Sequence, residues 1–267
     1  MKKFGNLRSM LANPNLLVSK AYINGEWVTE KNGKVFEVRN PATGEIIAEL
    51  PDLGVDYVKE AINGAAKAQK VWAKKTGKER AVILRKYYEL MMDNCDDLAL
   101  ILTSEMGKPI LEAKGEIFYG ASFVEWFSEE AKRVYGETIP GHQTDKRIIV
   151  TKQPIGVVAS ITPWNFPNAM IARKLAPALA VGCSFVAKPA AETPLSALAM
   201  VYLAELAGVP KGVFSMITSN AASEIGLEFC SNPKVRKLTF TGSTEVGRIL
   251  LRQGAQNIQK MSMELGG

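Results

Sequence analysis

The chain lacks several features that would place it in a protein class at once. It has three cysteines and one histidine in 267 residues. Cys95, Cys183 and Cys230 lie far apart without C-x-x-C spacing, so neither a disulfide framework nor a zinc site is indicated. The lone His142 has no Ser or Asp constellation beside it, which disfavours a hydrolase. No apolar run reaches the roughly 20 residues of a membrane helix. We expect a cytoplasmic protein with reduced thiols, no metal site and no membrane association.

A concentrated basic surface is also lacking. Lys and Arg number 33 against 27 Asp and Glu, a net charge of +6, but the two signs are interspersed. Nucleic acid is therefore not an expected partner, and an anionic small ligand suits this balance equally well. The first twenty residues carry only basic charge, although Pro14 and polar residues interrupt any apolar run. A mitochondrial type of transit peptide remains an alternative to a cytoplasmic start.

The amino-terminal half reads as hairpins followed by helices. "AYINGEWV" alternates apolar and polar residues around Asn24-Gly25, and "VFEVRNPATGEIIAEL" has a turn at 40–44, so each predicts a β-hairpin. From Val55 to about Gly136, apolar residues recur every three or four positions, which predicts helices. The aromatic series in this region, Phe118, Phe123, Trp126 and Phe127, is interpreted as packing rather than as a ligand site.

From residue 155 onward, short apolar stretches alternate with helical ones. The expected strands are "IGVVASIT", "SFVAKP", "VFSMIT", "KLTFTG" and "KMSMEL", and the expected helices cover 168–180 and 194–207 and begin at 222 and 243. This alternation predicts an α/β fold with a mostly parallel, Rossmann-like sheet covered by helices on both faces. Ligands bind at the carboxyl ends of such strands, so the functional residues are sought there.

The first strand ends in "ITPWNFPNAMIARK", where Pro163 and Pro167 stop the strand. Asn165 lies between them, and its amide can donate to a developing oxyanion. The alternative is that Asn165 only caps the next helix.

Phe166, Met170 and Arg173 share one helical face. We interpret this stripe as a substrate tunnel whose polar end, Arg173, binds a carboxylate. The alternative is that Arg173 and Lys174 are solvated surface charges.

Three further strand ends carry polar residues. Lys188 follows "SFVA", where it can contact a nucleotide phosphate or ribose, unless it only extends along the surface to solvent. "LTFTGSTEVG" forms a turn and a helix start suited to a pyrophosphate, although the spacing from Gly242 to Gly247 matches neither common phosphate-binding fingerprint. Glu264 ends the last strand, where burial could raise its pKa and make it a general base; a solvated Glu is the alternative.

Four stretches in order, "PWNFP", "AKPAAETP", "FTGSTEVG" and "MELGG", closely resemble the aldehyde dehydrogenase superfamily, over a region from about Ala21 to the end. "EMGKP", "EAKGEI" and "MIARK" look most like the succinate-semialdehyde dehydrogenases. The resemblance implies NAD(P)-dependent oxidation of succinate semialdehyde to succinate through a Cys thiohemiacetal and thioester. Lactaldehyde or glutarate semialdehyde as substrate, or a non-catalytic nucleotide-binding fragment, are the alternatives.

The resemblance also implies residue roles. Asn165 would donate to the oxyanion, Glu264 would activate water, and Arg173, with Phe166 and Met170, would hold the substrate. Lys188 would contact the adenosine ribose or its phosphate, and Ser243 the pyrophosphate. Residues implied to contact the cofactor are Ile161, Thr162, Pro163, Trp164, Lys188, Ala191, Gly242, Ser243 and Leu265. Many NAD-preferring relatives have Glu at the position of Ala191, where it repels a 2′-phosphate. NADP is therefore expected to be accepted at least as well as NAD.

The resemblance divides the chain as follows: 1–131 and 149–257 form the cofactor-binding domain, 132–148 begin the oligomerisation segment, and 258–267 begin a truncated catalytic domain. Without a partner, the oligomerisation segment would offer an open sheet edge. None of the three cysteines has a context that matches the family nucleophile, which would follow Gly267 in a complete chain. We therefore expect this chain to be inactive alone. The resemblance also implies that the complete enzyme is a homodimer or homotetramer.

Overall fold

The computed structural model describes residues 6–266. A seven-stranded sheet crosses its centre in the order β11-β10-β7-β8-β9-β1-β2. The strands from β11 to β9 are parallel, and β1 runs antiparallel to both β9 and β2. The expected parallel α/β sheet is confirmed. Its strands are β1 (Ala21–Ile23), β2 (Glu26–Val28), β7 (Val157–Ile161), β8 (Ser184–Lys188), β9 (Phe214–Met216), β10 (Val235–Gly242) and β11 (Lys260–Leu265).

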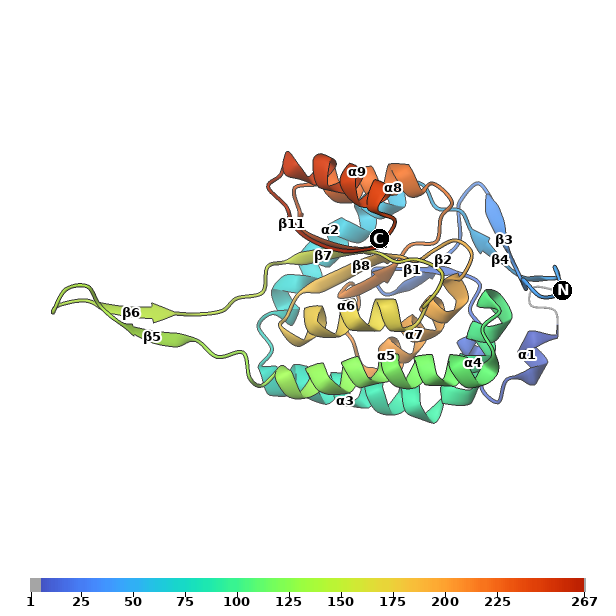
Figure 1. Cartoon of the computed structure of the whole chain (residues 1–267), viewed down its shortest axis with the longest axis horizontal. Helices are drawn as coiled ribbons and strands as arrows, with labels where there is room; N and C mark the ends of the chain where they lie inside the picture. Colours follow the sequence, from blue (N-terminus) through green and yellow to red (C-terminus); the bar gives the residue numbers. More distant parts are fainter. Residues whose placement is uncertain (1–5, 267) are drawn as a thin grey trace.

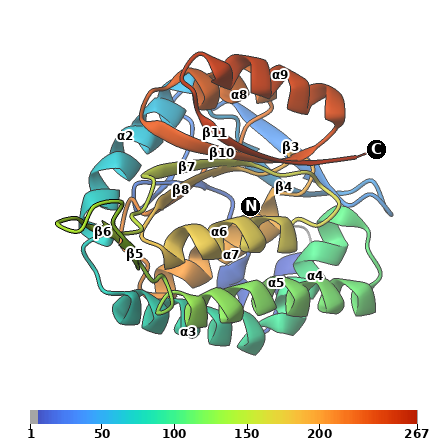
Figure 2. The same ribbon diagram turned by 60° about the vertical axis from the view of Figure 1, so that its left-hand side comes forward.

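Helices cover both faces of this sheet (Figures 1 and 2). One face carries α2 (Val55–Trp72), α8 (Ala222–Ser231) and α9 (Thr244–Ala255). The other carries α6 (Ala169–Ala180) and α7 (Pro194–Ala207), beneath which lie α3 (Gly77–Asp93), α4 (Cys95–Met106) and α5 (Ile110–Glu130). The short helices α1 (Leu7–Met10) and η1 (Pro14–Leu16) precede the first strand. Among residues 6–266, no helix is long and apolar enough to span a bilayer.

The sheet separates two hydrophobic cores. Side chains of successive strand residues point to opposite faces, so Val157 and Ala159 belong to one core and Val158 to the other. In β8, Phe185 and Val186 are divided in the same way. Burial on both faces explains why these strands are short apolar runs without polar alternation.

Both expected amino-terminal hairpins are present. Asn24 and Gly25 have φ values of 54° and 88°, the left-handed conformation that a two-residue turn between β1 and β2 requires. The second hairpin pairs β3 (Val35–Arg39) with β4 (Ile46–Pro51). Here the N–H of Gly44 donates to the carbonyl oxygen of Asn40 across the turn.

A third hairpin leaves the body of the molecule. It consists of β5 (Glu137–Pro140) and β6 (Arg147–Val150), all of whose residues are exposed, and it projects as a long arm (Figure 1). The helical region therefore ends at Glu130, a few residues before the expected limit.

The interpretation of the aromatic series on α5 as core packing is wrong for two of its members. Phe118 is 50% exposed and Trp126 is 65% exposed. The buried face of α5 is formed instead by small and aliphatic residues such as Ala121 and Val124. Phe118 and Trp126 therefore lie on the outer face of the helix.

Candidate functional site

The strand ends that carry unusual residues meet at one edge of the sheet. In the parallel register, Ile161 lies opposite both Lys188 and Phe240, and Gly242 lies opposite Leu265. The segments that follow β7, β8, β10 and β11 therefore begin side by side, as the sequence predicted. This edge is the candidate site.

The segment from Thr162 to Asn168 crosses this edge between β7 and α6. The Thr162 side chain is buried, and its hydroxyl makes no hydrogen bond among the described residues. Trp164, at 53% exposure, and Asn165 are turned outward. Asn168 holds the N-cap position of α6 without a side-chain capping bond. The alternative reading of Asn165 as a helix cap is thus not what the structure shows; its amide makes no hydrogen bond within residues 6–266.

Residues from other helices hold this segment in place. The Nζ of Lys108 donates to the carbonyl oxygen of Asn165 at 3.0 Å and lies 2.6 Å from a carboxylate oxygen of Glu116. The other oxygen of Glu116 accepts the N–H groups of Asn168 at 2.9 Å and Ala169 at 3.2 Å. The sequence had not singled out Lys108 or Glu116.

The predicted stripe along α6 is only partly assembled. Met170 and Arg173 lie on α6, where the guanidinium is 3.9 Å from the Met170 sulfur and 5.2 Å from the centre of the Phe123 ring. Phe166 precedes the helix and stacks instead on Lys108, whose Nζ lies 3.6 Å from the ring centre. The half-buried Arg173 has no ion-pair partner among the described residues. A ligand carboxylate can therefore approach it without displacing one.

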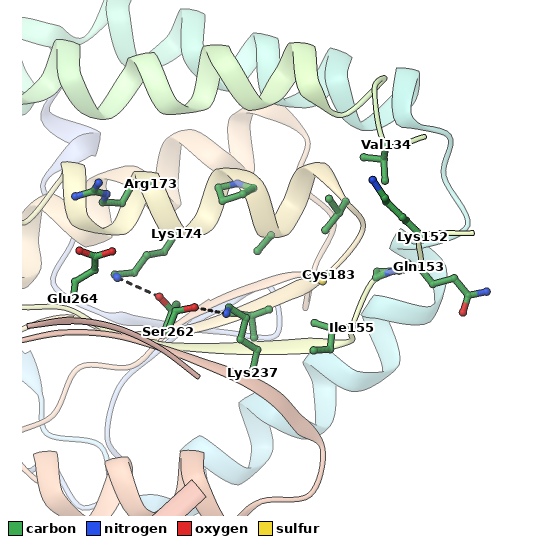
Figure 3. Close-up of a pocket in the computed structure, with 16 residues that line it drawn as sticks. Val134, Lys152, Gln153, Ile155, Arg173, Lys174, Cys183, Lys237, Ser262 and Glu264 are labelled. Atoms are coloured by element: carbon green, nitrogen blue, oxygen red, sulfur yellow. Dashed lines mark hydrogen bonds between the residues drawn. The ribbon is translucent and has the colours of Figure 1, made fainter. Parts of the chain in front are cut away.

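A cavity of about 530 Å³ lies between α6 and the strands β7, β10 and β11. Figure 3 shows Arg173, Lys174 and Glu264 gathered at one of its ends. Its lining includes four cationic side chains, Lys152, Arg173, Lys174 and Lys237, and one carboxylate, Glu264. The excess of positive charge favours an anionic ligand.

Lys174 is not the solvated charge considered as an alternative, because it is 8% exposed. Its Nζ donates to the Thr239 hydroxyl at 3.2 Å, and burial lowers its pKa to about 8, while Glu264 acts in the opposite direction. For Glu264 the structure shows the alternative of a solvated side chain rather than a buried one. Glu264 is exposed because β11 is the edge strand and has β10 as its one neighbour in the sheet.

Lys188 ends β8 and is 4% exposed. Burial lowers its pKa, and its Nζ donates to the Pro189 carbonyl oxygen at 3.2 Å. It is therefore not a surface lysine that extends to solvent. Ala191 and Glu192 follow it and line a second cavity, of about 570 Å³.

The turn from β10 into α9 completes the edge. Ser243 is exposed and caps α9 by accepting the N–H of Val246 at 3.3 Å. A Cβ on Gly242 would lie 2.5 Å from the Phe240 ring, so a side chain does not fit there. Leu265 packs against Gly247, where a Cβ would lie 2.6 Å from it.

These features suit a dinucleotide. The N-terminus of α9 offers backbone N–H groups to a pyrophosphate, and Lys188 has donors left besides the one that bonds the Pro189 carbonyl oxygen. The buried Thr162 hydroxyl has no hydrogen-bond partner in the described part of the chain. In contrast, no group of three or more His, Cys, Asp or Glu side chains within residues 6–266 could hold a metal.

The three thiols do not belong to this edge. Cys95, Cys183 and Cys230 are free and buried, and burial raises the pKa of each, that of Cys230 to about 11. Cys183 precedes β8, at the opposite end of that strand from Lys188. None of the three is placed as a nucleophile for the strand ends.

Comparison with known proteins shows the family of the chain. Residues 27–267 match the aldehyde dehydrogenase family, to which the chain therefore belongs. It is 60% identical over 257 residues to a glutarate-semialdehyde dehydrogenase of Pseudomonas aeruginosa and 57% identical over 257 residues to an NADP⁺-dependent succinate-semialdehyde dehydrogenase of Escherichia coli. Both alignments cover 96% of this chain and 53% of the relative. The chain thus spans about half the length of these relatives.

The fold comparison gives the same result. An aldehyde dehydrogenase structure from Brucella melitensis biovar abortus superposes with a TM-score of 0.95 at 56% identity, covering 97% of this chain and 53% of that one. The mixed α/β sheet flanked by helices is therefore the fold of this oxidoreductase family.

Proposed function

We infer that the complete enzyme oxidises succinate semialdehyde to succinate with NADP or NAD. By the complete enzyme we mean this chain together with a carboxyl-terminal part like that of its relatives. The observation that carries the inference is Arg173, a half-buried guanidinium without an ion-pair partner in the described chain, at a cavity with excess positive charge. The names of the two relatives support it, because both substrates are aldehydes with a carboxylate. Glutarate semialdehyde, one methylene longer, is the second candidate.

The residues at the strand ends supply three roles in this reaction. The side-chain N–H of Asn165 donates a hydrogen bond to the oxyanion. That oxyanion forms when a Cys thiolate of the carboxyl-terminal part attacks the aldehyde. Glu264 takes a proton from the water that releases the acid. Arg173 pairs with the substrate carboxylate, and Phe166 and Met170 line its path. The chain alone lacks a placed thiol and is expected to be inactive.

The bound dinucleotide supplies a hydride acceptor, and this chain holds it. Lys188 binds the adenosine ribose or its 2′-phosphate, and the α9 turn at Gly242 and Ser243 binds the pyrophosphate. Ile161, Thr162, Pro163 and Trp164 would lie along the nicotinamide side, and Leu265 would also contact the cofactor. Ala191 leaves room for a 2′-phosphate where a Glu would repel it, which supports NADP at least as well as NAD.

We assign the projecting hairpin to assembly. Residues 132–148 begin an oligomerisation segment. Its strand β5 pairs with β6, which continues past that boundary to Val150, and both exposed strands offer unpaired edges to another copy of the protein. Residues 1–131 and 149–257 form the cofactor-binding domain, and 258–267 begin the catalytic domain. The complete enzyme is a homodimer or homotetramer. The three unpaired thiols of this chain suit a cytoplasmic location.

The test is Arg173→Ala in the complete enzyme. Losing a charge-assisted contact is expected to lower kcat/KM for succinate semialdehyde by about 10- to 100-fold, while butanal, of equal length but neutral, changes by less than about threefold. Arg133→Ala, an exposed Arg paired with Glu130, is the matched control. Unchanged discrimination between charged and neutral aldehydes would refute the role, and preference for lactaldehyde would point to a neutral substrate. The 267-residue chain alone is expected to reduce no cofactor.

A further inference from the structure

The segment that carries Asn165 is fixed by a group of contacts that the reaction as described does not use. The Asn165 side chain makes no hydrogen bond within residues 6–266, yet the backbone of the segment is held on both sides of the turn by Lys108 and Glu116. These two residues are more than fifty positions away in sequence, with separations of 57 and 52. The turn is therefore anchored from outside its own strand and helix.

Lys108 and Glu116 form a single buried unit. Their side chains are 8% and 1% exposed, and the 2.6 Å contact joins them directly. Each has hydrogen-bonding capacity left after this contact, and each directs it to the backbone of the turn: Lys108 as a donor at Asn165, Glu116 as an acceptor at Asn168 and Ala169. Replacing one partner leaves the other as an unpaired buried charge, so substitution of either residue is expected to disrupt the contacts of both.

The local sequence explains how the pair reaches the turn. Gly107, with a φ of 84°, ends α4 in the left-handed conformation, and Pro109 precedes α5, so Lys108 lies in a tight corner. Glu116 and Gly120 lie one helical turn apart on α5. A Cβ on Gly120 would lie 2.2 Å from the side-chain oxygen of Asn168. The missing side chain at Gly120 thus allows α5 to approach closely enough for Glu116 to cap α6.

We propose that Lys108 and Glu116 are positioning residues for the oxyanion site: they fix the backbone of 165–169 so that the Asn165 amide is held for donation. This inference rests on the proposed function, in which Asn165 is the donor. An oxyanion donor acts only within hydrogen-bond distance of the developing charge, and a displacement of about 1 Å can cost on the order of 100-fold in rate.

The first experiment uses the 267-residue chain itself. Hydrogen exchange is measured in Lys108→Met, which keeps most of the length of the unbranched side chain and removes the ammonium group. Within residues 164–170, the amides of Asn168, Ala169 and Met170, which donate to Glu116 and to the Phe166 carbonyl oxygen, are expected to exchange at least about tenfold faster, while those of β8 keep their protection. Lys114→Met, which removes an exposed pair with Asp96, is the control and is expected to change neither. Unchanged exchange at 164–170 would overturn the proposal.

The second experiment uses the complete enzyme. Lys108→Met is expected to lower kcat by about 10- to 100-fold with the KM of the cofactor unchanged. In an Asn165→Ala background, the same substitution should cost less than about threefold, because the group it positions is already gone. A purely structural role would give the full loss in both backgrounds, and that result would also overturn the proposal.

The two experiments separate this inference from the proposed function. If the complete wild-type enzyme oxidises no aldehyde, the proposed function fails, while exchange at 164–170 still decides whether the pair holds the turn. If Lys108→Met exchanges rapidly throughout, it has unfolded, and Glu116→Gln takes its place. That variant keeps the shape of the Glu116 side chain and one of its acceptor oxygens. Its hydrogen exchange at 164–170 is compared with that of β8 in the same way.

Discussion

Glu105 predicts a pH dependence of folding that can be worked out from the structure. It lies in the last turn of α4 with 3% exposure, and its carboxyl oxygens accept the N–H groups of Leu195 at 2.6 Å and Ser196 at 2.8 Å. It thereby caps the first turn of α7. Burial raises its pKa from 4.5 to about 8, and the bonds from Leu195 and Ser196 only partly offset this.

The sign of the effect follows from proton linkage. Between pH 4.5 and 8 the folded state keeps a proton on Glu105 that the unfolded state releases. The stability that Glu105 contributes is therefore fully present below the pKa of the unfolded state. It decreases as the pH rises and is lost once the pH has passed the pKa of the folded state. At 1.36 kcal/mol per pKa unit, the loss over this window is about 4 to 5 kcal/mol.

Glu105→Gln tests this reasoning, since the amide has nearly the shape of the protonated acid and does not titrate. Urea unfolding is followed from pH 5 to 8.5 for both proteins. Over this pH range the free energy of unfolding of the wild type is expected to fall, relative to that of the variant, by most of the roughly 4 to 5 kcal/mol that the raised pKa implies. Glu112→Gln, an exposed position on α5, is the control. Parallel profiles for wild type and Glu105→Gln would show that Glu105 is ionised in the folded state and would refute the argument.

Two further predictions concern single side chains. Gly120→Ala is expected to lower the free energy of unfolding by about 1 to 3 kcal/mol in urea titrations. Gly115→Ala on the same helix, where a Cβ meets nothing within 4 Å, should raise it by up to about 1 kcal/mol; equal effects at the two sites would contradict the close approach of α5 to α6. Ala191→Glu is expected to weaken NADP binding by the chain at least about tenfold and to leave NAD binding nearly unchanged, because the carboxylate repels a 2′-phosphate. Titration by calorimetry measures both, and wild-type chain that binds NAD much more tightly than NADP would refute the cofactor preference.

The parts of the fold that were predictable follow from local patterns. The Asn24-Gly25 turn requires two left-handed residues, and this sequence supplies the pair that adopts them most readily. The helix expected at 194–207 and the strand expected at 260–265 were placed with the observed limits, since apolar periodicity and a flanking Pro or Gly mark such elements. The strand-end rule then placed Asn165, Lys188 and Gly242 at one edge without any knowledge of distances.

The contacts that hold the site were not predictable in the same way. Lys108, Glu116 and Glu105 act on backbone groups 52 to 91 positions away, and no local pattern encodes such pairings. One indication was available for Glu116, since it lies among Ala113, Ile117 and Gly120 on the buried face of α5. A charged residue in an apolar stripe must have a partner, although its identity appears only in three dimensions.

If the proposed function is correct, one continuous segment, the turn with Asn165 and helix α6, positions both the aldehyde end and the carboxylate end of the substrate. The N–H of Met170 donates to the carbonyl oxygen of Phe166, and that of Ala172 to the carbonyl oxygen of Asn168, so the turn with Asn165 continues directly into α6. Arg173 follows on the same helix, where its position relative to the turn is fixed by the helical repeat. A clamp at the start of α6 therefore controls the oxyanion donor and the carboxylate anchor together. Discrimination between succinate and glutarate semialdehydes should then depend on side chains beside Arg173, such as Met170 and Phe123, rather than on movement of the turn.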